Sequence, residues 1–94
     1  MQFLIAPFFS KEAVQQAHAR CVELGYPAER LIFANYNWSG SLLRRSEVSV
    51  SFYVAETSPT QWVTVILNRP TCFSRWSVTA TEEAEVPERD EEQE

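Results

Sequence analysis

The sequence predicts an α+β fold, a single small domain in which one helix packs on one face of a mostly antiparallel sheet. At 94 residues the chain has room for one core only. One segment shows helical periodicity, and five others have the length or the alternation of strands. The last four strands follow one another through short turns, which favours antiparallel neighbours. The predicted order is therefore β-α-β-β-β-β over residues 1–81, followed by a tail over residues 82–94.

The helix is expected over residues 11–24. Ser10 precedes it as an N-cap, good helix formers fill it, and Gly25 stands where helices commonly end. The apolar residues recur at spacings of three and four and form one stripe, which consists of Val14, Ala17, Cys21 and Leu24 with Ala13 beside it. We expect this stripe to face the sheet.

Five strands are expected, over residues 2–9, 31–36, 47–55, 62–67 and 72–80. The third of them alternates most clearly, with Val48, Val50, Phe52 and Val54 on one face, and this predicts a half-exposed strand. The first, second and fourth strands are apolar on both faces, which predicts burial on both sides. Polar and small residues then break the run and predict a loop or a wide hairpin with Trp38 inside it; they are Asn35, Asn37, Ser39, Gly40 and Ser41.

One helix is too small to cover such a sheet. A helix of about 14 residues is about 21 Å long and about 10 Å wide, whereas five strands form a sheet about 24 Å wide. The second face must be closed by a curl of the sheet, by a second copy of the chain in a homodimer, or by another partner. The sequence leaves these three alternatives open.

The charge is divided unevenly along the chain. There are 8 basic and 13 acidic side chains, for a net charge of −5. Residues 82–94 hold eight of the acids and one base, which gives −7, so residues 1–81 carry +2. Because few apolar residues follow Thr81, we expect a disordered acidic tail. Three roles are open for it: it keeps the domain soluble, screens Arg44 and Arg45, or docks on a basic partner.

No residue pattern indicates catalysis. His18 and Cys21 stand three apart on the predicted helix, the spacing of a Cys–His pair or, with Cys72, of part of a metal site. Cys21, however, lies on the stripe assigned to the core, and the chain has neither a second histidine nor a CxxC motif. We therefore expect no enzymatic activity, metal or cofactor, and two buried reduced thiols rather than a disulfide framework.

Arginines and aromatic residues gather in two short segments, and the candidate partner-binding residues are Tyr36, Trp38, Arg44, Arg45, Phe73 and Arg75. Trp, Tyr and Arg are the usual hot spots of protein interfaces, where lysine is depleted. The chain contains a single lysine. We therefore expect a non-catalytic protein-binding module. The alternative is a small nucleic-acid-binding protein that uses the same surface, with the acidic tail as an autoregulator.

The N-terminal segment is apolar but has neither a basic region nor a cleavage site, so no signal peptide is expected. No segment is long enough to span a bilayer, and two cysteines fit a cytoplasmic protein. The size, the acidity and the lack of catalytic groups resemble, at the level of class only, small inhibitors encoded by phages and mobile elements, anti-CRISPR proteins among them. The resemblance implies a regulator of a larger protein or nucleoprotein machine.

Overall fold

The computed structural model describes residues 9–39, 47–71 and 73–86, and it has the predicted α+β fold. The elements, in chain order, are helix α1 (Lys11–Glu23), a short 3-10 helix η2 (Ala28–Arg30), and strands β1 (Leu31–Ser39), β2 (Glu47–Val54), β3 (Thr60–Asn68) and β4 (Ser77–Val86). The predicted strand over residues 2–9 lies outside the described residues except for Phe9, which is not in a strand.

Helix α1 begins and ends close to the predicted positions. The Ser10 hydroxyl accepts a hydrogen bond from the backbone N–H of Ala13, which satisfies one of the free donors of the first turn. Leu24 caps the C-terminus instead of extending the helix. Gly25 follows with φ of +105°, a conformation that residues with a Cβ rarely adopt.

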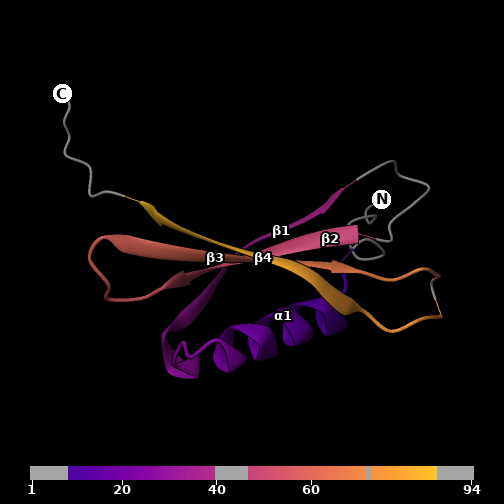
Figure 1. The fold of residues 1–94 in the computed structure, drawn as a ribbon, viewed down its shortest axis with the longest axis horizontal. Helices are drawn as coiled ribbons and strands as arrows, with labels where there is room; N and C mark the ends of the chain where they lie inside the picture. The colour runs from indigo at the N-terminus through magenta and orange to yellow at the C-terminus, as the bar shows by residue number, and fades with distance from the viewer. Residues whose placement is uncertain (1–8, 40–46, 72, 87–94) are drawn as a thin grey trace, which may run out of the picture.

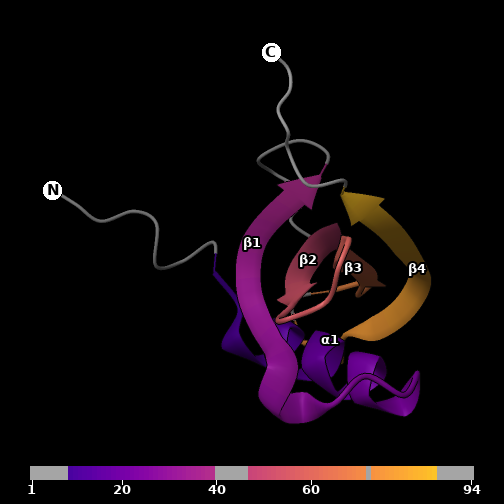
Figure 2. The ribbon, with the colours of Figure 1, turned by 90° about the vertical axis from the view of Figure 1, so that its left-hand side faces the viewer.

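The four strands form one antiparallel sheet in the order β1-β2-β3-β4, so sequence neighbours are also spatial neighbours. Helix α1 lies along one side of this sheet (Figure 1). The sheet twists and curves strongly, with β1 and β4 on its two flanks (Figure 2). The predicted antiparallel arrangement is therefore confirmed. The sheet also curls, which is the first of the three ways in which its second face was expected to be closed.

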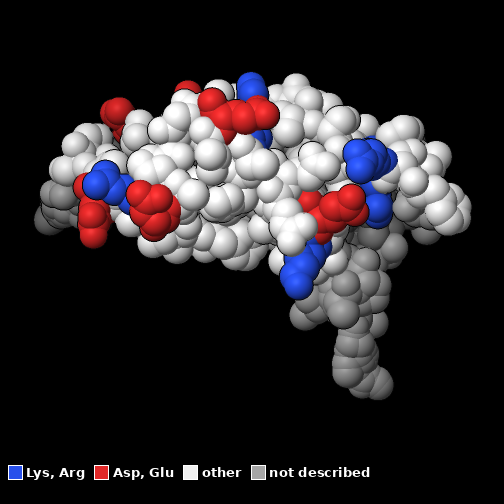
Figure 3. All heavy atoms as spheres, turned by 90° about the horizontal axis from the view of Figure 1, so that it is seen from below, with Lys and Arg blue, Asp and Glu red and all other residues white. Residues whose placement is uncertain are grey.

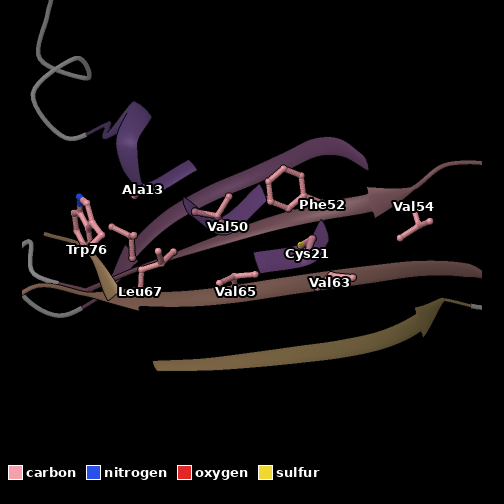
Figure 4. Packing of buried hydrophobic residues seen from close by; sticks show 11 residues of the cluster. Ala13, Cys21, Val50, Phe52, Val54, Val63, Val65, Leu67 and Trp76 are labelled. Atoms are coloured by element: carbon pink, nitrogen blue, oxygen red, sulfur yellow. The ribbon is translucent and has the colours of Figure 1, made fainter. Parts of the chain in front are cut away.

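The core fills the space between α1 and the face of β2 and β3 that it covers (Figure 4). The predicted alternation of β2 is confirmed, because Val48, Val50, Phe52 and Val54 are all buried. The other buried apolar residues are Ala13, Ala17 and Cys21 of α1, Val63, Val65 and Leu67 of β3, and Trp76. This burial of apolar surface is the main force that holds the helix on the sheet.

Strand β1 differs from its prediction in two ways. It runs on past residue 36 to Ser39, so that Trp38 belongs to the strand and pairs with Val48 of β2, which fits the hairpin of the two alternatives. It is also not buried on both faces, because Ile32 is 51% exposed and Phe33 is 45% exposed. The physical reason is the position of β1 at the edge of the sheet, where few neighbours surround a side chain.

Strand β4 crosses the predicted boundary between the domain and its tail. It begins at Ser77 instead of residue 72 and continues to Val86, past the predicted end of the domain at Thr81. Residues 82–86 pair with residues 60–64 of β3. Backbone hydrogen bonds hold this stretch in the sheet, so it needs no apolar side chains of its own. The remainder of the predicted tail, residues 87–94, lies outside the described residues.

Both edge strands carry an extra residue relative to their partner. The register shifts between Phe33 and Asn35 in β1, which leaves Ala34 without a counterpart in β2. In β4, Thr79 is the extra residue, between the partners of Ile66 and Leu67. Bulges of this kind increase the local twist and discourage unregulated pairing of an exposed strand edge.

Candidate interaction surface

The strand register brings one end of each strand to the same side of the molecule. Ser39 pairs with Glu47, Glu47 with Asn68, and Asn68 with Ser77. The connection from β3 to β4 therefore leaves and returns at this side, which also holds the N-terminus of α1 (Figure 1). We call it the loop end and define it by the described residues Ser10, Trp38, 68–71 and 73–77.

Ser10 joins three parts of the loop end. Besides capping α1, its hydroxyl accepts a hydrogen bond of 3.0 Å from Nε1 of Trp76. Its backbone N–H donates to the Tyr36 hydroxyl at 3.0 Å. Because these bonds connect residues 26 and 66 positions apart, the start of the helix, strand β1 and the segment before β4 are held together.

Tyr36 and Trp38, which the sequence predicts as partner-binding anchors, pack against the core. Both are half-buried and pack against the buried cluster. The Tyr36 hydroxyl is engaged by Ser10, and its ring lies 4.7 Å from that of Phe9. Burial raises the pKa of Tyr36 above its usual value. The Tyr36 hydroxyl therefore already has a hydrogen-bond partner within the chain.

Phe73 and Arg75 do lie on the surface, in the connection from β3 to β4. Phe73 is 94% exposed, the highest value among the exposed large apolar residues, and Arg75 is exposed as well. Thr71 shapes the turn beneath them. Its Oγ1 accepts from the backbone N–H of Phe73 at 3.2 Å and lies 2.8 Å from Oγ of Ser74, whose N–H donates to the Thr71 carbonyl. A hydrogen-bonded turn thus presents a bare aromatic ring to solvent.

Arg69 is a member of this surface that the sequence does not single out as an anchor. Its guanidinium carbon lies 4.4 Å from the ring centre of Trp76, a cation–π contact. Trp76 itself is only 3% exposed. The Arg-Pro pair at positions 69 and 70 predicts a turn, but no sequence pattern shows that the arginine folds back over an indole seven residues later.

Arg44 and Arg45, the remaining candidate residues, lie outside the described residues. At this end of the sheet the described charged side chains include Arg69 and Arg75 and also Glu47, which begins β2 beside Asn68. Acidic residues occupy the far half of β4, where Glu82, Glu83 and Glu85 stand. Seen from the side of α1, charged side chains are scattered singly or in small groups over a mostly uncharged surface (Figure 3).

Cys21 and His18 are arranged as structural residues. Burial first, and the nearby Glu83 second, raise the pKa of the Cys21 thiol from 9.0 to about 11. The thiolate needed for nucleophilic chemistry is thereby disfavoured. The His18 ring packs edge-on against Phe52 at 5.7 Å. Across the described residues, no group of three or more His, Cys, Asp or Glu is placed to hold a metal ion, and no helix there is long and apolar enough to cross a membrane.

In comparisons with protein-family models, with curated proteins and with solved structures, nothing matches this chain.

Proposed function

We propose that this protein is a non-catalytic protein-binding module, a small regulator or inhibitor of a larger protein or nucleoprotein machine. The proposal includes a cytoplasmic location. One observation carries it: Phe73 is 94% exposed on a turn that hydrogen bonds among Thr71, Phe73 and Ser74 hold in shape. A fully exposed aromatic ring is unfavourable in water, and a preformed turn loses little conformational entropy when it binds.

The surrounding residues support the same function. Arg69 and Arg75 flank Phe73 in the same connection, and an aromatic anchor with neighbouring arginines is the usual composition of an interface hot spot. The expected partner therefore offers an apolar pocket for the ring and acidic groups at its rim.

The test is affinity capture of the tagged full chain from its own host, followed by binding measurements with the purified partner. Phe73→Ala should weaken binding at least about tenfold, as expected for a hot-spot residue. Tyr53→Ala, which removes an exposed aromatic ring far from the loop end, is the matched control and should leave affinity unchanged. A partner that binds wild type, Phe73→Ala and Tyr53→Ala equally would exclude the loop end as its docking site.

Nuclease treatment during the capture tests the alternative of nucleic-acid binding. On the sheet face opposite α1, the described residues include no Lys or Arg, and the rings of Tyr53 and Trp62 pack against each other with centroids 4.1 Å apart and planes tilted by 50°. This face thus lacks the cations that a nucleic-acid platform needs. Co-purification that disappears with nuclease, together with affinity that falls steeply with salt, would favour the alternative.

A further inference from the structure

The two halves of the molecule differ in charge. The last residues of β4 lie at the end opposite the loop end, because Val86 pairs with Thr60 whereas Ser77 pairs with Asn68. We call the half around Val86 the far half and define it by residues 17–31, 55–61 and 82–86. It contains two basic and six acidic side chains, which are Arg20, Glu23, Glu29, Arg30, Glu56, Glu82, Glu83 and Glu85.

The other half has the opposite sign. Its described charged residues are three bases and two acids, namely Lys11, Glu12, Glu47, Arg69 and Arg75. The described residues thus carry a net charge of −4 in the far half and +1 in the half that contains the loop end. Figure 3 shows both halves from the side of α1, with the loop end on the right. The charge of the described part is therefore polarised along its length.

The C-terminal tail adds to this difference. Residues 87–94 contain five acids and one base, for a net charge of −4, and they follow directly on Val86. The tail is therefore attached to the half that is already acidic. Because like charges repel, its carboxylates gain most from contact with cations that lie elsewhere.

The tail is too short to bind the loop end of its own chain. From Val86 back to Ser77, β4 has nine residue steps, which correspond to about 30 Å. The eight residues of the tail span at most about 29 Å when fully extended. Even a straight tail would bring only its last residue near Ser77, short of Arg69 and Arg75. A second molecule is not limited in this way.

The loop end offers the groups that such a tail would bind. Phe73 is 94% exposed there, and Arg75 is exposed two residues later. Arg69 adds a second guanidinium, which lies over the Trp76 ring. Arginine binds carboxylates through paired charge-assisted hydrogen bonds. Pro87 stands directly before the acidic run, so the tail brings an apolar ring for Phe73 as well as carboxylates for the arginines.

The overall charge of −5 on each copy does not prevent this contact. At physiological ionic strength the Debye length is about 8 Å, which is much shorter than β4. The loop end of one copy therefore interacts with the charges directly in front of it rather than with the net charge of its neighbour.

We propose that the acidic tail of one copy of this protein binds the loop end of a second copy, so that the chain self-associates head to tail. The tail carboxylates pair with Arg69 and Arg75, and the start of the tail packs against Phe73. The contact joins two unlike surfaces, in contrast to a symmetric dimer through the open sheet face. It uses the surface proposed above for partner binding but requires no other partner.

The first test is the molar mass of the full-length protein, measured by light scattering over a range of concentrations. The mass should rise above that of a monomer as the concentration increases. It should return to the monomer value in about 1 M salt, where the Debye length is about 3 Å. A wild-type protein that stays monomeric at every concentration would overturn the proposal. Capture of another partner that requires Phe73 would in that case still support the function proposed above.

The loop end is tested with Phe73→Ala and Arg75→Ala in one protein. Both side chains are exposed, so this loop-end variant should keep the circular dichroism spectrum of wild type. It should self-associate at least about tenfold more weakly, as expected for hot-spot residues. Tyr53→Ala with Arg30→Ala removes the same two residue types from other exposed positions and should associate as wild type does.

The tail is tested with Glu91→Gln, Glu92→Gln and Glu94→Gln in one protein, which should associate as weakly as the loop-end variant. In an equimolar mixture of the two variants, the intact tail of one meets the intact loop end of the other. The mixture should therefore form dimers at a concentration at which each variant alone is monomeric. A symmetric interface gives no such complementation. Wild-type association of either variant, or a mixture that stays monomeric, would overturn the proposal.

Discussion

Replacement of Ser10 by alanine tests how the loop end is held together. The change removes the N-cap of α1, which costs about 1 kcal/mol. It also leaves the indole N–H of Trp76 without a partner at a site only 3% exposed, which costs about 1–3 kcal/mol. The unfolding free energy should therefore fall by about 2–4 kcal/mol. For a domain of this size, that is a decrease in melting temperature of roughly 10–25 °C.

The assay is urea unfolding followed by far-UV circular dichroism, in a double-mutant cycle with Trp76→Phe. Phenylalanine has no N–H to leave unpaired, so in that background Ser10→Ala should cost only the cap, about 1 kcal/mol. Gln15→Ala, on the exposed face of the same helix, controls for changes in helix propensity. Equal losses from Ser10→Ala in both backgrounds would refute the role of the Ser10–Trp76 bond.

Three further predictions concern the core, the response to pH and self-association. Leu67→Ala should lower the unfolding free energy by about 2–5 kcal/mol, whereas Ile66→Ala, on the opposite face of β3, should cost clearly less; equal losses would contradict the assigned faces. Burial raises the pKa of Cys21 from 9.0 to about 11 and that of Tyr26 from 10.0 to about 12, with the Glu83 hydrogen bond as a second cause for the tyrosine. Both side chains have a higher pKa in the folded state than in the unfolded state, so their contribution to stability is complete below pH 9 and is lost as the pH rises through 11–12. If the melting temperatures of wild type and Cys21→Ala fall equally over this range, the Cys21 thiol does not cause the loss. If a second copy covers the open sheet face, light scattering should give a dimer that Trp62→Lys returns to a monomer, and a wild-type monomer at high concentration would exclude it.

Much of the fold could be predicted because it depends on local patterns. Ser10 and Gly25 mark the ends of α1 through cap chemistry, which acts within a few residues. The alternation in β2 specifies which side chains are buried, since a strand with one covered face has only one acceptable orientation. The sequence-based predictions were wrong where the structure of a segment depends on residues that are distant in the sequence but close in space. Pairing with β3 extends β4 beyond Thr81, and the edge position of β1 exposes Ile32 and Phe33.

The candidate sites were less accessible to sequence reasoning. Phe73 and Arg75 were predicted as surface residues from their place in a strand pattern, and they are exposed, although they lie in a connection before β4. Tyr36 was predicted as an anchor from its residue type alone. The structure shows that its hydroxyl is bonded to Ser10, 26 positions away, and no local pattern encodes such a contact.

The sequence by itself determined the fold class, the antiparallel pairing of successive strands and the buried face of β2, because hydrophobic periodicity and turn chemistry operate between near neighbours. Only the tertiary structure decided that hydrogen bonds join Ser10 to both Tyr36 and Trp76. Those residues are separated by dozens of positions along the chain. Their contacts exist because the strand register and the packing of α1 bring them together, and these in turn depend on the whole core.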